Sequence, residues 1–554
     1  MKRRFLLTSA AVFLSAGALS AQHHHGAPAA AAEPASKPVT LFARLGSHRH
    51  PIATASPEAQ RFFDQGVVLL FGFNHEEAIR MFQRAAELDP KAAMPHWGMA
   101  LAHGANYNDP APPAERLQKA RAEVDKALAL SASGPANERA YIEALSKRYS
   151  ADPSADKEPL LRDYHAAMKA LSEKYPDDLD AATLYAESGM NLRPWKLWRP
   201  DGTPEEGTSE ILATLESVLK RDPMHPGANH YYIHAVEASP HPERAIPSAE
   251  RLKTLVPMAG HLVHMPAHIQ MRTGDYLGAE KANAVAADVD RAYIRDTGAS
   301  GLYPIMYYNH NVHFESAAAA MAGRHAVAKK AADLLYADVL PVVSLDPMLE
   351  GFLVQPVVVA VRFRKWADLR AMPDPGGELP TTRAFWLYGR AVAAAETGDA
   401  KAMSQRQAEF EAAVQAIPED RHFGPMNTVR GVLAVAEADL EARIAETRKD
   451  RRAAIAAWTK AAAAEDQLSY DEPPAWQQPM REALGAALLA DGRAAEAETV
   501  FRADLDRHPR NPRSLLGLAA SLKAQGKTAD AAWVQAQFET AWKHADTKLT
   551  LGQL

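Results

Sequence analysis

Small and apolar residues recur at fixed intervals near the start of the chain, with polar residues between them. In the first such segment they are Gly66, Ala78, Phe82, Ala85 and Pro90. The small residues let two antiparallel helices approach closely, Phe82 fills the space between them, and Pro90 ends the second helix. The pattern therefore predicts a helical hairpin.

The same frame returns near the other end of the chain. Its positions there are Leu484, Gly485, Gly492, Ala497, Phe501 and Pro509, and Gly526 and Ala531 repeat Gly492 and Ala497 after 34 residues. This frame resembles the tetratricopeptide repeat (TPR), a 34-residue helix-turn-helix unit. We expect an all-α, TPR-type solenoid of helical hairpins over residues 57–546, followed by a short tail at 547–554.

Between the two ends the repeats are degenerate but can be phased on further small residues and prolines. Two insertions interrupt them, at residues 192–202 and 470–476, and both contain tryptophan, proline and charged residues. Long loops in compact folds are often functional. The insertions are consistent with contact to a bound ligand and also with simple packing between irregular repeats.

Residues 226–325 carry most of the candidate chemistry, because nine of the 22 histidines fall between 225 and 313. The candidates lie in three stretches with helical spacing, so the members of each stretch share one helix face. They are His230, His234 and Glu237; His261, His264 and His268; and His310 and His313. His230 and His264 are 34 residues apart, as are His234 and His268. In TPR proteins these places line the concave groove, so the resemblance implies that the histidines converge there.

A divalent metal ion would explain this clustering, because several buried imidazoles without a shared partner are unfavourable. Histidines four residues apart on a helix can bind one ion. We expect His230, His234, His264 and His268 as ligands of zinc or copper. The remaining candidates, His261, His310, His313 and Glu237, are then neighbours or exchangeable ligands. Met265 or Met271 would be a softer ligand for copper.

Three other interpretations remain open. With three protein ligands the ion would keep a free position and could activate water, with Glu237 or Glu315 as base, which would make the protein a metal-dependent enzyme. Without a metal, the groove would bind a peptide or protein partner. The histidines could also be satisfied core residues. The sequence has no phosphate-binding glycine loop, Gly-x-Ser-x-Gly or His-Glu-x-x-His motif.

The N-terminus has the three parts of a secretory signal over residues 1–21: Lys2-Arg3-Arg4, an apolar stretch and small residues near Ala21. Arg3-Arg4 also resembles a twin-arginine signal. We expect export to the periplasm or the medium, and a disordered His/Ala/Pro-rich linker over 22–56. If cleavage falls after Ser20, His23 becomes the third residue of the mature chain, which would suit an amino-terminal copper or nickel chelate; the alternative is a disordered polar tail.

Overall composition narrows the partners. Sixty-two basic and 68 acidic residues give a net charge of -6, which argues against nucleic-acid or polybasic membrane binding. No later apolar run is long enough to span a membrane. The chain has no cysteine, so disulfides and thiolate ligands are excluded.

The motifs at residues 230–237, 261–268, 307–313 and 470–476 together resemble those of a group of exported bacterial TPR proteins. The resemblance covers nearly the whole mature chain. It implies the fold and the compartment, and it supplies no reaction.

Overall fold

The computed structural model describes residues 37–152 and 154–554. The predicted signal sequence and the first part of the predicted linker, including His23, lie outside the described residues. Most of the described chain is helical, and each α-helix packs against the next in sequence. The prediction of an all-α solenoid of helical hairpins is confirmed.

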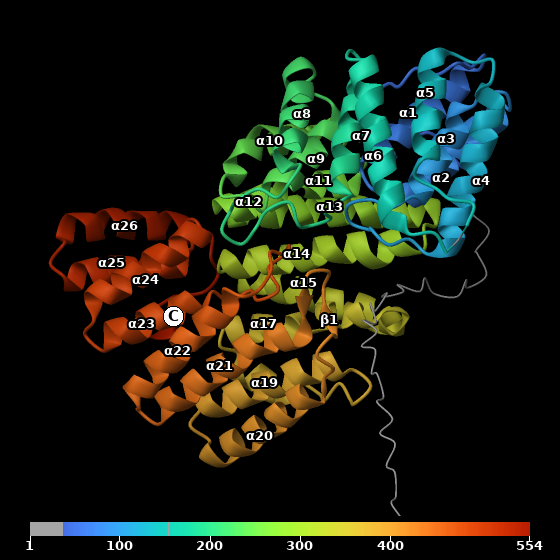
Figure 1. The fold of residues 1–554 in the computed structure, drawn as a ribbon. Helices are drawn as coiled ribbons and strands as arrows, with labels where there is room; N and C mark the ends of the chain where they lie inside the picture. The colour runs from blue at the N-terminus through green and yellow to red at the C-terminus, as the bar shows by residue number, and fades with distance from the viewer. Residues whose placement is uncertain (1–36, 153) are drawn as a thin grey trace, which may run out of the picture.

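The first hairpins form the upper right part of the molecule in Figure 1. Their helices are α1 (Pro57–Phe71), α2 (His75–Leu88), α3 (Met94–His103), α4 (Ala114–Ser131), α5 (Ala136–Ser146), α6 (Lys157–Lys174), α7 (Leu179–Met190) and α8 (Thr208–Arg221). The chain curls within this part, because α1 also contacts α9 (Pro226–Val236). Helices far apart in sequence thus meet.

The central helices follow, with several short or irregular turns. They are η1 (Pro242–Ala245), α10 (Ile246–Leu255), α11 (Gly260–His264), α12 (Pro266–Thr273), α13 (Tyr276–Thr297), the π-helical η2 (Tyr303–Tyr308), α14 (Asn309–Met321), α15 (His325–Val339), η3 (Leu340–Leu345), η4 (Pro347–Leu349) and α16 (Glu350–Leu353). In Figure 1 α14 crosses the middle of the molecule, between the N-terminal and C-terminal helices.

The C-terminal half continues the hairpins and includes one small antiparallel strand pair. Its elements are α17 (Gln355–Arg362), α18 (Trp366–Ala371), α19 (Pro380–Glu396), α20 (Ala400–Ala416), β1 (His422–Phe423), β2 (Asn427–Thr428), α21 (Val429–Thr447), α22 (Arg451–Glu465), α23 (Met480–Ala490), α24 (Ala494–Arg507), α25 (Pro512–Ala524), α26 (Thr528–Ala541) and η5 (Leu551–Gln553). The last residues pack back on the centre, where Asp546 accepts hydrogen bonds from the first N–H groups of α15.

The repeat frame has a direct physical basis in the packing of two phenylalanines. A Cβ atom placed on Gly66 or Gly98 would lie 2.5 or 2.8 Å from the Phe82 ring. Phe501 is enclosed in the same way, between Gly485 and Gly517. Each ring is fully buried between the first helix of its own hairpin and the first helix of the next. Only glycine leaves room for it.

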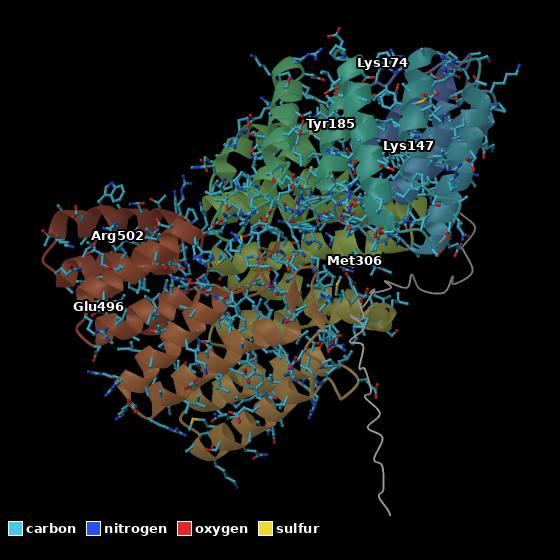
Figure 2. All side chains as sticks on the ribbon, in the orientation of Figure 1. Lys147, Lys174, Tyr185, Met306, Glu496 and Arg502 are labelled. Carbon is cyan, nitrogen blue, oxygen red and sulfur yellow. The ribbon has the colours of Figure 1, made fainter. Side chains whose placement is uncertain are left out.

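Two large apolar cores result. One joins residues from Leu45 to Tyr307 and the other residues from Val354 to Val534, with smaller clusters around α14 and α15 between them. The charged side chains labelled in Figure 2 are exposed: Lys147 and Lys174 in the N-terminal part, and Glu496 and Arg502 in the C-terminal part. No helix within the described ranges is long and apolar enough to cross a membrane.

The segment before α1 differs from the prediction. Residues 37–56 fall within the linker that we expect to be disordered, yet they pack against the helices. Leu45 joins the core, and the His50 Nδ1 lies 2.7 Å from Oδ2 of the buried Asp180. His48 Nε2 lies 3.1 Å from Oδ1 of the same carboxylate. The segment also forms one wall of a cavity of about 640 Å³. The histidine–aspartate contacts anchor it there.

These contacts predict a pH dependence of stability. Burial lowers the pKa of His48 and of His50, but Asp180 outweighs this effect, so both pKa values lie above the ordinary 6.5. Burial raises the pKa of Asp180, and the three histidines around it outweigh that, so it lies well below 3.8. The stabilisation is therefore complete between pH 3.8 and 6.5, and is lost as the pH rises through the raised histidine values.

We expect the Asp180→Asn variant to be about 3 kcal/mol less stable than the parent at pH 6, and the gap to narrow at pH 9. Urea unfolding at the two pH values measures it. An equal gap at both would mean that histidine charge does not contribute to anchoring the segment.

Candidate metal centre

The sequence-predicted histidines come from four central helices. His230 and His234 lie on α9, with Glu237 just after its end; His261 and His264 lie on α11, His268 on α12, and His310 and His313 on α14. The helical spacing is present in each stretch. A turn at Met265 separates α11 from α12, because Pro266 has no N–H to donate into the helix.

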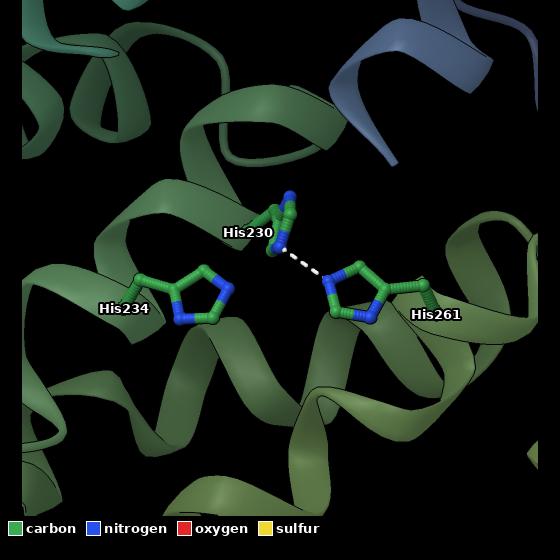
Figure 3. A group of neighbouring side chains, drawn as sticks. All are labelled: His230, His234 and His261. Atoms are coloured by element: carbon green, nitrogen blue, oxygen red, sulfur yellow. Dashed lines mark hydrogen bonds between the residues drawn. The ribbon is translucent and has the colours of Figure 1, made fainter. Parts of the chain in front are cut away.

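Six imidazoles form two triads. The first triad is His230, His234 and His261, and the second is His264, His268 and His310. In each triad every ring contributes one nitrogen atom, and these three nitrogen atoms lie within 4.8 Å of one another. In the first, the Nε2 atoms of His230 and His261 are 3.1 Å apart (Figure 3). In the second, His264 Nε2 lies 2.7 Å from His268 Nε2 and 3.1 Å from His310 Nε2.

The grouping differs from the expected one. The four favoured ligands do not surround one point: His230 and His234 pair with His261, and His264 and His268 pair with His310. The reason is the separation between α9 and α12. Across the two triads the closest rings, His234 and His268, have centroids 5.5 Å apart. His261 and His310 are therefore members of the triads rather than neighbours.

Fixed acceptors hold the Nδ1 side of four of the rings. His230 Nδ1–H donates to the Phe71 carbonyl at 2.6 Å, and His264 Nδ1–H donates to Asn283 Oδ1 at 2.6 Å. The Asn283 amide is oriented by its own N–H, which donates to the Ala279 carbonyl. An imidazole that donates from Nδ1 presents the Nε2 lone pair on its other side. These Nε2 atoms are the ones that meet within the triads.

Glu237 joins the triads. His234 Nδ1–H donates to Oε1 of Glu237 at 2.8 Å, and His268 Nδ1–H donates to Oε2. One carboxylate thus orients one ring in each triad. His234 Nε2 is buried and has no hydrogen-bond partner among the described residues. In Figure 3 this outer nitrogen of His234 faces the other two rings of its triad.

Burial also determines the charge of the centre. It is the main cause that lowers the pKa of His230, His261, His264 and His310 well below 6.5, and neighbouring imidazoles add to the effect. For Glu237, burial raises the pKa, but His268 and His234 outweigh it and bring it to about 2. His268 is the exception: burial lowers its pKa, but Glu237 outweighs burial and raises the pKa above 6.5. Apart from this His268–Glu237 pair, the centre consists of neutral imidazoles, which suit cation binding.

The centre is closed rather than part of an open groove, which corrects the expected concave surface. His230, His234, His261, His264 and His268 are at most 2% exposed. Three aromatic side chains from other repeats cover the first triad: Phe73, Tyr107 and Trp195, whose ring centroids lie 4.6 Å from His230, 5.2 Å from His234 and 5.7 Å from His234, respectively. A peptide in a groove could not reach these imidazoles.

Trp195 belongs to the first predicted insertion, and it has an unusual backbone with φ of +62°. One side of the residue lines a cavity of about 520 Å³ together with Arg193, Lys196 and Met426. Its ring stacks on Tyr107, with centroids 5.3 Å apart. The insertion therefore contacts the centre, because Trp195 both lines this cavity and packs against His234.

The second predicted insertion approaches from the C-terminal half. The Tyr470 hydroxyl donates to Glu472 Oε1, and Arg272, which donates to the Glu237 carbonyl, lies over the Tyr470 ring. Burial raises the pKa of Glu472 to about 7, with opposing effects from His268 and Glu237. Glu472 is thus a second carboxyl group near the centre.

Several expected residues lie outside it. His313 Nε2 accepts from Gln477 at 2.9 Å and lies 3.2 Å from Gln355 Oε1. Met265 is buried in the N-terminal core and Met271 packs in a small apolar cluster. Burial raises the pKa of Glu315 to about 7, and its charged neighbours are Glu280, Lys330, Arg291 and Asp288. None of these positions supports a ligand or base.

The sequence interpretation missed the supports. The Phe71 carbonyl and Asn283 carry no motif. Asp290 accepts from Tyr303 and Asn311 and lies so close to Gly260 that a Cβ there would overlap it. His225 likewise belongs to no motif, yet its Nδ1 accepts a hydrogen bond from the Ala228 N–H at the start of α9.

His48, Asp180 and His225 also lie within metal-ligand distance of one another. Because Nδ1 of His225 accepts a hydrogen bond, its proton must be on Nε2, which lies 2.9 Å from Asp180 Oδ1. His225 is therefore a donor to Asp180, and the group supports α9 rather than holding an ion.

Comparison with known proteins leaves the family open. No protein-family model and no curated protein matches the chain. Among solved structures, yeast Tom70 is 14% identical over 89% of this chain and 93% of its own, with a TM-score of 0.32. The human IFIT1 dimer with PPP-AAAA is 16% identical over 87% of this chain and 90% of its own, with a TM-score of 0.29. At these TM-scores neither likeness contributes to the functional argument.

Proposed function

We propose that this protein binds a divalent metal ion, zinc or copper, at the buried histidine centre. The observation that carries the proposal is the direction of the rings. The Nδ1–H groups of His230, His234, His264 and His268 donate hydrogen bonds to fixed acceptors. Their Nε2 lone pairs therefore face other imidazoles. Zinc and copper both accept neutral imidazole nitrogen.

A metal-free centre would be left with unfavourable contacts. His234 Nε2 would stay a buried acceptor that no donor in the described chain reaches, at a cost of about 1–3 kcal/mol. His264 Nε2 would meet both His268 Nε2 and His310 Nε2, yet its single lone pair accepts only one hydrogen bond. A hydrogen bond from His268 requires that ring to carry a second proton, which burial opposes and Glu237 favours. A metal ion in a triad would remove the need for protons between its Nε2 atoms, because each Nε2 lone pair could bind the ion.

Three imidazoles leave a position on a zinc or copper ion for a further ligand. Such a centre can activate water, or store or transfer an ion. We propose that it operates outside the cytoplasm, because residues 1–21 read as an export signal. The competing proposal, a metal-free TPR scaffold for a peptide or protein partner, requires a surface other than these buried rings.

Elemental analysis of the mature protein, produced without an affinity tag, tests metal binding. We expect bound zinc or copper in the parent, and a reduced content in the His264→Ala/His268→Ala variant with nearly unchanged helical content by circular dichroism. Metal binding to the folded state should also raise the melting temperature, and a chelator should reverse this. No metal in the parent, even after reconstitution, would favour the metal-free scaffold.

Trp195 predicts how the centre is reached. The Trp195→Ala variant removes the aromatic contact with Tyr107 and His234, so we expect a chelator to remove the metal about tenfold faster, equivalent to a barrier lower by about 1.4 kcal/mol. Stopped-flow or timed extraction measures the rate. Trp533, which is 70% exposed, provides the matched control as Trp533→Ala. Equal rates for both variants would place the entrance elsewhere.

A further inference from the structure

We infer that the centre holds two metal ions, one in the first triad and one in the second. This inference rests on the proposed metal binding and extends it, because the sequence pattern alone favours a single ion bound by four histidines.

Each triad contains one nitrogen pair with the spacing of two ligands on one ion; a second pair in the second triad, His264 Nε2 and His268 Nε2, is closer, at 2.7 Å. Zinc binds imidazole nitrogen at about 2.0–2.1 Å, so ligands at tetrahedral angles lie about 3.3 Å apart. The Nε2 atoms of His230 and His261 are 3.1 Å apart, and those of His264 and His310 are 3.1 Å apart. Each pair comes from two different helices, α9 with α11 in the first triad and α11 with α14 in the second.

The two sets do not merge into one. His230 has its close nitrogen contact with His261, whereas His264 has its contacts with His268 and His310. Between triads the closest rings are His234 and His268 at 5.5 Å and His261 and His264 at 5.7 Å. A single ion would leave at least one triad unsatisfied.

Glu237 could in principle share one ion with His234 and His268, since these three groups also lie within ligand distance. The structure opposes this arrangement. The carboxylate already accepts the Nδ1 protons of both rings, and this leaves their Nε2 atoms as the ligand atoms. Glu237 therefore has the role of a shared support, which orients one ligand of each ion.

Charge points to the class of ligand that completes the centre. The six imidazoles are neutral ligands, and Glu237 supplies one negative charge beside two dications. An oxygen anion bound at the free positions lowers the remaining positive charge. Water bound to zinc loses a proton near neutral pH, so hydroxide is the ligand of the right chemistry. Each ion thus has three imidazoles and a position for hydroxide.

Metal stoichiometry tests the inference. Tag-free mature protein is loaded with zinc chloride, dialysed against metal-free buffer and analysed for zinc per protein chain. We expect two ions in the parent and one in each of two variants, His230→Ala/His261→Ala and His264→Ala/His310→Ala. A ratio of one in the parent, lost in either variant, would overturn the two-ion inference and leave the proposed metal binding intact. A ratio of zero would overturn both.

Shape-conserving variants guard against loss of folding. His261→Phe keeps an aromatic ring against Phe73 and Tyr307, whose ring centroids lie 5.6 and 5.0 Å away, and removes the ligand nitrogen. His310→Phe likewise replaces an imidazole of the second triad with an aromatic ring that has no nitrogen. We expect each to retain one tightly bound ion. His313→Phe is the matched control, because His313 lies on α14 beside Gln355 and Gln477. It should retain two ions, and loss of an ion there would contradict the assignment.

Discussion

Replacing Glu237 with alanine is expected to weaken both metal sites, each by about 10- to 100-fold. The carboxylate is 1% exposed and holds His234 and His268 through their Nδ1 protons. Without it, both rings lose their orientation and two buried donors lose their acceptor. The metal-free variant should also be about 3 kcal/mol less stable. Zinc affinity by competition with a chelator and urea unfolding measure the two effects.

Glutamine at the same position should separate the two sites. Its amide oxygen can accept from only one Nδ1–H, while its NH₂ group must donate to the other ring. That second ring then carries its proton on Nε2 and cannot bind an ion. Glu237→Gln should therefore retain one ion at close to the parent affinity and lose the other.

The control for both substitutions is Glu243→Gln, because Glu243 lies in the next turn, is 55% exposed and pairs with His241. It should change neither metal content nor stability. If Glu237→Gln bound two ions as tightly as the parent, the carboxylate would not be orienting the ligands.

The fold could be predicted because its information is local and repeated. Gly66 and Phe82 share one hairpin, as do Gly485 and Phe501, and each pair makes the same contact at a fixed spacing. The segment at 37–56 could not be predicted in this way. Its order depends on the contact of His50 with Asp180, which lies more than a hundred residues away in the chain. Local sequence patterns do not reveal a partner at that distance.

The candidate site was predictable in its residues and not in its grouping. Helical spacing brings His230 and His234 to one face, and the structure places them together. Which histidines of other helices join them depends on distances between helices, which spacing does not give. The closure of the centre depends in the same way on Phe73, Tyr107 and Trp195. These three residues come from other repeats and cover the histidines. Positions that line the groove in a regular TPR solenoid are therefore buried in this protein.

Replacing Phe501 with alanine is expected to reduce the stability of the C-terminal repeats by about 3–5 kcal/mol. The ring is fully buried between Gly485 and Gly517, and neither glycine has a side chain to fill the cavity. Because contacts in repeat proteins are mostly between neighbours, the loss should appear first in α23 to α26. Amide hydrogen exchange measures it helix by helix, with Trp533→Ala as an exposed control.

The equivalent variant, Phe82→Ala, removes the same ring from the first hairpin and should cost a similar amount of stability. Its effect on the centre should differ. Phe501 lies in α24, and none of the hydrogen bonds that orient the histidines comes from its hairpin, so Phe501→Ala should keep its metal. Phe82 packs against α1, which contacts α9 and whose last residue, Phe71, accepts the His230 Nδ1 proton. Phe82→Ala should therefore loosen the first triad and lower its zinc affinity. Equal metal loss in both variants would show that the centre depends on the whole solenoid rather than on the closure of its N-terminal part.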